Sequence, residues 1–321
     1  VWFKAIQFFT DTTKNAIFRG VRKELKRFKP DIIQVHECTQ LMSLAISFYA
    51  KFKNIPVVLY QGQYQYPPNI FFAAIQKLYD GSFGILQRSL VFQSTAKTPH
   101  AKKFLSKLGY KNIALTPVGL DIEAIDQGHK IKWQKKYKIT SDTKVMLYIG
   151  ILEKRRNIEF LIKLIQELPK DFMLLIAGEG PEKARCESLA RELFLEKKVV
   201  FLGQVKQSQI SSLYRYCDAY LMPSDYEIYG MTILEAMYLG ALVISTRTAG
   251  GLSIIDNETT GILLDGLDIV EWRDVILGVV HNPDRARLIT ENAQQSVLKN
   301  YTWEAISIKM EKMYLKVLRE S

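Results

Sequence analysis

Short apolar runs alternate with amphipathic stretches of helical length along the second half of this 321-residue chain, and this alternation restricts the fold more than any other feature. The apolar runs, rich in β-branched and large aliphatic residues, predict strands at 145–149, 172–177, 199–202, 219–222, 242–245 and 261–264. Helical patterns lie between them at 158–168, 182–194, 209–216 and 231–239. Apolar strands that alternate with helices form a parallel sheet covered on both faces. We therefore predict a Rossmann-like α/β domain over residues 121–300.

The first 120 residues repeat this pattern less completely. Strands are expected at 31–35, 56–60, 89–92 and 113–116, with helices at 41–52 and 97–108. We predict a second Rossmann-like domain over residues 1–120. Because the chain opens at Val1 within an amphipathic helical pattern, we expect this domain to lack N-terminal βα units. Residues 118–143 are expected to form a linker, and residues 301–321 a C-terminal helix.

The positive charge is concentrated in the first part of the chain. Residues 1–120 contain 17 Lys and Arg against 5 Asp and Glu, whereas the remaining residues contain 27 against 28. This asymmetry indicates an anionic partner for the first domain, either anionic lipid, an anionic saccharide acceptor or nucleic acid, or else a cationic face kept for solubility. No nucleic-acid reader motif is present, so nucleic acid is not expected. The basic, apolar segment 14–29 fits a helix packed on its own sheet, with its charged side available to a membrane.

The cysteine and histidine patterns indicate no metal site. Three widely spaced cysteines favour a reducing compartment over a disulfide framework or a structural zinc site, so we expect a cytoplasmic protein. The four histidines have no ligand spacing, and no Asp-x-Asp motif is present. No apolar run approaches the roughly 18–20 residues that cross a bilayer. We therefore expect activity without a metal or cofactor, on a chain that does not span a membrane.

The most informative motif is the stretch 223–240, which follows the predicted strand 219–222 and opens a helix at Gly230. The first-turn amides of such a helix, here those of Met231 and Thr232, lack intrahelical partners and attract phosphate. Glu227 precedes the helix, and Glu235 lies about one and a half turns into it. Two carboxylates on either side of a diphosphate suit the ribose and hexose of a nucleoside-diphosphate-sugar. Two surface glutamates near a helix start, where Glu is favoured, would have the same spacing.

This stretch resembles the signature of the retaining glycosyltransferases of family four, E-x-[FY]-G-x-x-x-x-E-A, which have the GT-B fold of two facing Rossmann-like domains. Further motifs of that family follow one another in the expected order, at Pro30–His36, Gly150–Asn157, Ala177–Pro181, Phe201–Gly203, Ala241–Thr246, Ala249–Gly251 and Gly261–Leu263. The sequence departs from the pattern at Ile151, where the family commonly has Arg, and at Ser253-Ile254, where it often has Pro-Glu.

The resemblance implies a role for each matching residue. Glu227 would contact the donor sugar at the reacting centre, Glu235 would hold the ribose hydroxyls, and Arg156 would neutralise the leaving diphosphate. The remaining donor-binding residues that it implies are Lys154 and Arg155 beside Arg156, Gly150, Gly178, the backbone of Val205 near the base, Tyr229, Gly230, Met231 and Thr232. Gln61 stands in a loop where the family often has His near the donor sugar, and its amide offers a hydrogen bond to a hydroxyl.

Taken together, these features predict a retaining glycosyltransferase that moves a hexose from a nucleotide-diphospho-sugar to a saccharide or lipid-linked acceptor hydroxyl. Its expected setting is polysaccharide or glycolipid synthesis at the inner face of a membrane. Two alternatives stay open, a GT-B nucleotide-sugar epimerase and a non-catalytic nucleotide-sugar-binding module. A nicotinamide dehydrogenase is disfavoured because no G-x-G-x-x-G follows the first strand of either half.

Overall fold

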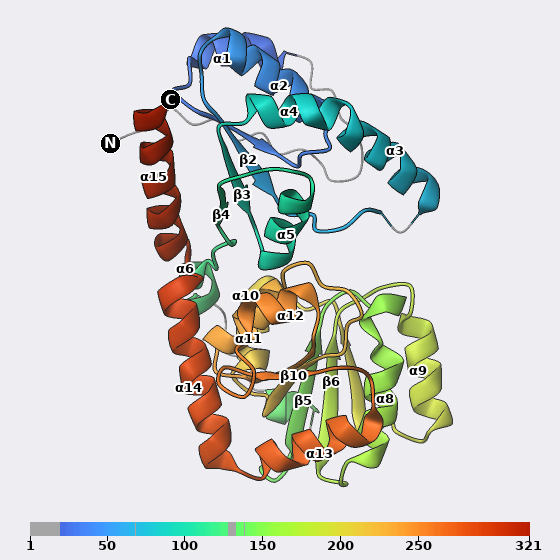
Figure 1. Ribbon diagram of the computed structural model, residues 1–321. Coiled ribbons are helices and arrows are strands. Elements are labelled where there is room, and N and C mark those ends of the chain that lie inside the picture. The colour runs from blue at the N-terminus through green and yellow to red at the C-terminus, as the bar shows by residue number, and fades with distance from the viewer. Residues whose placement is uncertain (1–19, 68, 128–132, 138) are drawn as a thin grey trace. The chain divides into compact units, whose positions relative to one another are not determined.

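The computed structural model describes residues 20–67, 69–127, 133–137 and 139–321. The chain divides into two compact units (Figure 1), one extending up to Val118 and including Ile306–Ser321, the other comprising Gly119–Ala305. Each unit has a parallel sheet of its own. The predicted division into two α/β domains is thus present, and the C-terminal helix belongs to the first unit from Ile306 onward.

The second unit is built on a six-stranded sheet in the order β10-β9-β8-β5-β6-β7. Every strand pair in it is parallel, and the strands are β5 (Lys144–Ile149), β6 (Phe172–Ala177), β7 (Val199–Gly203), β8 (Ala219–Met222), β9 (Leu242–Thr246) and β10 (Ile262–Leu264). This is the doubly wound Rossmann order, in which the chain starts at the centre and the direction of winding reverses between β5 and β8. All six predicted strands are confirmed to within one residue at each end.

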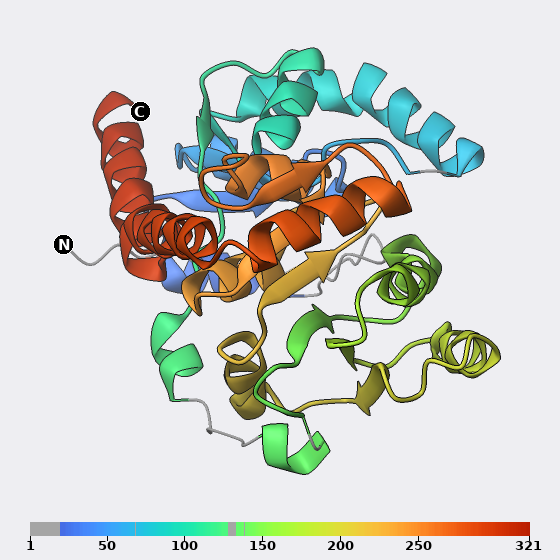
Figure 2. The ribbon, with the colours of Figure 1, turned by 90° about the horizontal axis from the view of Figure 1, so that it is seen from below.

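Helices follow these strands and bury the apolar sheet. They are α8 (Ile158–Glu167), α9 (Lys183–Glu192), α10 (Gln207–Tyr214), α11 (Met231–Tyr238), α12 (Ala249–Ile254), α13 (Ile269–Val280) and α14 (Pro283–Asn300). Right-handed crossovers place helices on opposite faces when the winding direction reverses. Accordingly, α8 packs with α9 and α13, whereas α11 packs with α10, α12 and α14 (Figure 2). The core between these layers contains fully buried residues such as Met146, Leu174 and Trp272.

The first unit has a four-stranded parallel sheet in the order β1-β2-β3-β4. Its elements are α1 (Val21–Phe28), β1 (Ile33–His36), α2 (Leu41–Phe52), β2 (Val57–Gln61), α3 (Ile70–Gly81), α4 (Phe83–Leu90), β3 (Gln93–Ala96), α5 (Pro99–Lys107) and β4 (Ile113–Leu115). The strand predicted at 89–92 is wrong, because α4 extends to Leu90 and β3 begins only at Gln93. Polar residues form this strand: the buried Thr95 is satisfied by a hydrogen bond to Thr116.

The predicted linker 118–143 contains two short helices that belong to the second unit, α6 (Ile122–Asp126) and α7 (Trp133–Tyr137). Asp126 accepts hydrogen bonds from Arg215 at 2.9 Å and from the Tyr238 hydroxyl at 2.6 Å. The buried Trp133 indole donates to Ser212 at 2.7 Å. This segment is therefore packed structure and not a free connection over its described residues.

The basic helix α1 and the C-terminal helix both pack in the first unit. Leu25 of α1 is buried in its core, so the preferred interpretation of segment 14–29 as a packed helix holds for its described part, residues 20–29; residues 14–19 lie outside the described residues. The C-terminal helix α15 (Trp303–Glu320) buries Val317 against Ile32 and Val58. None of the described helices combines the length and apolar character that crossing a bilayer requires.

Candidate active site

The reversal of winding in the second unit brings two loops together at the centre of its sheet. One follows β5 and contains the single-turn helix η1 (Lys154–Arg156), and the other follows β8 and extends to Gly230 at the start of α11. The carboxyl ends of parallel strands at such a switch point form the ligand-binding crevice of doubly wound folds. The candidate residues predicted after both strands therefore lie in one place.

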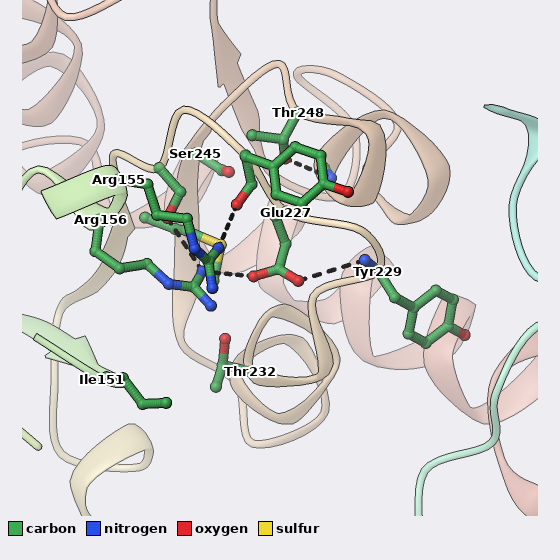
Figure 3. A network of polar contacts seen from close by, with 12 residues as sticks. Ile151, Arg155, Arg156, Glu227, Tyr229, Thr232, Ser245 and Thr248 are labelled. Atoms are coloured by element: carbon green, nitrogen blue, oxygen red, sulfur yellow. Dashed lines mark hydrogen bonds and ion pairs between the residues drawn. The ribbon is translucent and has the colours of Figure 1, made fainter. Parts of the chain in front are cut away.

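An ion pair between Arg156 and Glu227 joins these two loops (Figure 3). Arg156 Nη1 lies 2.5 Å from Glu227 Oε2, and the two side chains are only 15% and 16% exposed. The same nitrogen donates to the buried Ser224 hydroxyl at 3.2 Å. Burial works against the charge on the guanidinium, but the hydrogen bond and charge of Glu227 outweigh it and raise the pKa of Arg156. Arg156 thus stays cationic and fixed in direction.

The Glu227 carboxylate is also held from its own loop. Its Oε1 accepts the Tyr229 amide at 3.4 Å, and the Glu227 carbonyl accepts the Gly250 amide from the start of α12 at 2.8 Å. A Cβ at position 250 would lie 2.7 Å from the Tyr229 carbonyl carbon and 2.9 Å from Glu227 Cγ, so only glycine fits. The Tyr229 side chain is buried and points away from Glu227 in Figure 3, which leaves its amide as its contribution to the site.

Arg155 connects the backbones of the two loops. Its Nη1 donates to the Tyr226 carbonyl at 2.6 Å, its Nη2 pairs with Glu153 at 2.5 Å, and its carbonyl accepts the Asp225 amide at 2.9 Å. Its position therefore indicates a structural tie between the loops. By contrast, the neighbouring Lys154 is solvent-exposed, as is Ile151 at the position where the resemblance predicts Arg.

The N-terminus of α11 presents unpaired backbone donors next to this pair. Gly230 caps the helix with a φ of 88°, a left-handed conformation that glycine adopts without steric cost. Among the described residues, the amides of Met231 and Thr232 have no hydrogen-bond acceptor. The Thr232 hydroxyl bonds the buried Tyr220 hydroxyl at 2.9 Å, which ties this first turn to the sheet. Two oriented amides with the positive end of the helix dipole form an anion-binding element.

Glu235 lies deeper along α11 and is only partly exposed. The Tyr214 hydroxyl donates to its Oε2 at 3.2 Å, and the Gln207 side chain also hydrogen-bonds to it. Burial raises the pKa of Glu235, whereas these two hydrogen bonds lower it, and burial dominates. The carboxylate is thus preorganised by α10 as a hydrogen-bond acceptor.

The other residues that the sequence predicts to bind the donor are Gly150, Gly178, Val205 and Gln61. Gly150 and Gly178 bring the β5 and β6 loops into contact, since a Cβ at Gly178 would lie 1.9 Å from the Gly150 carbonyl oxygen. Val205 lies in the half-exposed loop between β7 and α10. Gln61, in the first unit, is buried: its amide accepts the Cys38 N–H at 2.9 Å and donates to Glu37 at 2.6 Å and to the Gln63 carbonyl at 3.0 Å. Its hydrogen-bonding capacity thus serves the local fold.

Two residues that contact the Arg156–Glu227 pair or its loop, Ser224 and Gly250, are not among the site residues predicted from the sequence. Ser224 has no pattern that distinguishes it from an ordinary loop serine. Gly250 belongs to a paired-glycine motif that supports the family resemblance by its order along the chain. The motif does not predict that Gly250 contacts the Glu227 loop. Within the described part of the chain, no cluster of three or more His, Cys, Asp or Glu side chains is arranged to hold a metal ion.

Comparisons with known proteins show which family the chain resembles. A family model for the glycosyl transferases group 1 matches residues 129–296, more than half of the chain. The chain is 31% identical over 182 residues to an uncharacterized glycosyltransferase, MJ1607, of Methanocaldococcus jannaschii, covering 56% of this chain and 46% of that protein. It is 30% identical over 191 residues to N-acetyl-alpha-D-glucosaminyl L-malate synthase of Bacillus anthracis, covering 58% and 49%. The chain thus spans about half the length of these relatives.

Solved structures show the likeness of fold over nearly the whole chain. Anabaena Alr3699/HepE in complex with UDP matches with a TM-score of 0.79 at 16% identity, covering 92% of this chain and 82% of that one. A glycosyltransferase from Rickettsia africae matches with a TM-score of 0.77 at 20% identity, covering 98% and 85%. The resemblance expected from the motifs is therefore confirmed, and the chain belongs to the glycosyl transferases group 1 family, with the GT-B fold.

Proposed function

We propose that this chain transfers a hexose from a nucleoside-diphosphate-sugar to an acceptor hydroxyl with retention of the anomeric configuration. The observation that supports it most is the largely buried Arg156–Glu227 pair next to the unpaired amides of Met231 and Thr232. These groups provide a fixed cation and two amide donors for a diphosphate. Glu227 and Glu235 lie on either side of these two amides along the chain, so that one carboxylate can accept hydrogen bonds from a hexose and the other from a ribose.

In this proposal, Arg156 and the α11 amides stabilise the leaving diphosphate. Negative charge grows on the β-phosphate oxygens as the bond between the anomeric carbon and the diphosphate breaks, so donors that are already oriented and partly desolvated contribute most in the transition state. Arg156 presents donors in a fixed fork, which allows it to contact phosphate while it holds Glu227. Glu227 accepts hydrogen bonds from the hexose and orients its anomeric carbon, and Glu235 accepts those of the ribose.

The names of similar proteins support this class of donor and acceptor. Anabaena Alr3699/HepE binds UDP and UDP-glucose. A relative that matches 92% of this chain at 24% identity is the sulfoquinovosyl transferase SQD2 of Arabidopsis thaliana, of which it covers 58%. We infer a saccharide or lipid-linked acceptor, in polysaccharide or glycolipid synthesis on the cytoplasmic side of a membrane. Catalysis without a divalent metal is part of the proposal, and unchanged activity in excess EDTA is the expected result.

A donor panel tests the proposal. Thermal shift with a series of nucleoside-diphosphate-sugars identifies the donor that the full chain binds, and product analysis with candidate acceptors then measures transfer and the product anomer. Glu227→Gln is expected to lower kcat more than it raises the donor KM, and Glu235→Gln mainly to raise the donor KM. The exposed Glu196→Gln is the matched control and leaves both unchanged.

Two outcomes would replace the proposed reaction by another function, and a third would contradict the roles proposed for Glu227 and Glu235. Conversion of the donor with no acceptor present would indicate an epimerase. Donor binding without turnover, with every acceptor class tested, would indicate a binding module. Equal losses of kcat and donor affinity in Glu227→Gln and Glu235→Gln would contradict their separate roles.

A further inference from the structure

Two consecutive helices of the first unit expose most of their large apolar side chains. On α3, Ile70, Leu78 and Phe71 are 88%, 74% and 68% exposed. The other exposed members of this α3–α4 surface are Phe72, Ile75, Phe83, Ile85 and Leu86. In both ribbon views, α3 extends from α4 beyond the edge of the four-stranded sheet (Figures 1 and 2). Water-soluble surfaces rarely present so many neighbouring apolar groups unless they bind something.

The same two helices direct polar side chains inward. Asp80 is buried and accepts the Tyr66 hydroxyl at 2.9 Å. Gln87 is buried and accepts the Tyr79 hydroxyl at 3.1 Å, and the Gln76 amide nitrogen is also shielded from solvent. A helix that packs on a protein core normally buries its apolar stripe and exposes its polar one. In α3 and α4 this arrangement is inverted.

The inversion is regular along α3. At 100° per residue, Ile70, Leu78, Phe71, Ile75 and Phe72 occupy an arc of about 200°, and Asp80 lies on the opposite side. The apolar side chains therefore form one continuous outward face, as in helices that lie in the interfacial plane of a membrane. Isolated surface leucines, which need no explanation, do not form such a face.

The charge around this surface indicates the partner. On α3 and α4 the basic residues are Lys77 and Arg88, and the single acidic residue is Asp80, whose side chain is buried. The flanking residues up to 109 add four Lys and no acidic residue. Lys77 of α3 is also exposed and lies just outside the apolar arc, with its amine 5.5 Å from the Tyr66 ring centre. A second copy of this chain would set such cationic surfaces against each other with no exposed carboxylate in this segment to pair them. Anionic phospholipid offers both an apolar interior and negative headgroups.

We propose that α3 and α4 form a docking surface for an anionic lipid bilayer, with the exposed side chains of Ile70–Leu86 entering the headgroup boundary. The described part of the basic segment, residues 20–29, is not included in this surface, because Leu25 packs in the core of the first unit. The proposal rests on the exposure, inverted polarity and charge of one unit. It does not depend on the proposed transfer reaction.

Vesicle flotation of the full chain tests the proposal without any donor or turnover. Vesicles of equal parts phosphatidylcholine and phosphatidylglycerol are compared with pure phosphatidylcholine. Ile75→Ser/Leu78→Ser keeps the net charge and removes two exposed apolar side chains, so its fold is expected to be intact by circular dichroism. Val270→Ser/Leu288→Ser makes the same kind of change at two exposed helical positions of the second unit. Light scattering reports the oligomeric state of each protein.

The wild-type chain and the control are expected to float with the anionic vesicles and to bind pure phosphatidylcholine more weakly. Ile75→Ser/Leu78→Ser is expected to bind the anionic vesicles at least about tenfold more weakly. Equal binding of this variant and the wild type would overturn the proposal, since charge elsewhere would then suffice. A wild-type chain that ignores anionic vesicles would also overturn it, as would a dimer that only the α3 variant dissociates.

Discussion

Replacing Arg156 by Met and Glu227 by Gln, singly and together, measures the interaction that joins the two loops of the candidate site. A fully buried ion pair that loses one partner costs about 3–5 kcal/mol, whereas an exposed pair contributes about 0.2–1 kcal/mol. Here Nη1 and Oε2 are 2.5 Å apart, and about a sixth of each side chain is exposed. We therefore expect each single variant to lower the free energy of unfolding of the second unit by about 2–3 kcal/mol.

The double variant separates the pair from the other contacts of each residue. Because each single variant already loses the whole interaction, the sum of the two single losses counts it twice. The loss in the double variant should therefore be smaller than that sum by about 2 kcal/mol. Urea unfolding followed by tryptophan fluorescence is a suitable assay, because Trp133 and Trp272 are buried in the second unit. The measurement needs neither the donor nor the acceptor.

An exposed pair in the same unit is the matched control. Arg247 Nε lies 2.7 Å from Asp265, but both side chains are more than a third exposed. The corresponding double-mutant cycle consists of Arg247→Met, Asp265→Asn and the two changes together. It is expected to give a coupling energy below about 1 kcal/mol. If the coupling between Arg156 and Glu227 is no larger than that of the control, the pair does not hold the two loops together, and the reasoning is refuted.

Three further predictions concern single residues. The donor KM should rise as the pH falls through the pKa of Glu235, which burial raises above the ordinary glutamate value of 4.5, because protonation removes the acceptor; Glu235→Gln should abolish this pH dependence in steady-state assays. Gly250→Ala should lower kcat at least about tenfold by displacing the loop that holds the ion pair, whereas Gly278→Ala, whose Cβ meets nothing within 4 Å, should not; equal rates would contradict the packing argument. Gln61→Ala should lower the free energy of unfolding of the first unit by about 1–3 kcal/mol, because it leaves the Cys38 amide unpaired, without changing the donor KM; a changed donor KM with unchanged stability would restore Gln61 as a donor contact.

The sequence predicted the second unit well because its strands are apolar along their whole length. Residues 172–177 and 219–222 are strands with the predicted bounds, and alternate side chains of both strands belong to one core. The motif around Glu227 and Arg156 was also informative, because both residues directly follow strands that lie side by side in a doubly wound sheet. Their ion pair could not be predicted, since it depends on the path of two loops.

The first unit was harder to predict because polar and apolar residues exchange their usual places there. The strand β3 contains the buried Ser94 and Thr95, so the apolar residues just before it were assigned to the strand instead. The helices α3 and α4 were not predicted, and the polar residues that they bury, such as Asp80, are satisfied by side chains outside their own helix, here Tyr66. Gln61 is a similar case, because its partners in the β1 loop become neighbours only in the folded sheet.

The most direct test of the central claim is the response of two backbone amides to a nucleoside diphosphate. With the ¹⁵N-labelled full chain, titration of the diphosphate form of the donor's nucleoside is expected to shift the amide resonances of Met231 and Thr232, and the unphosphorylated nucleoside should leave them nearly unchanged. Saturating shifts that fall on other residues while these two amides stay in place would contradict the claim that the first turn of α11 binds the donor's diphosphate.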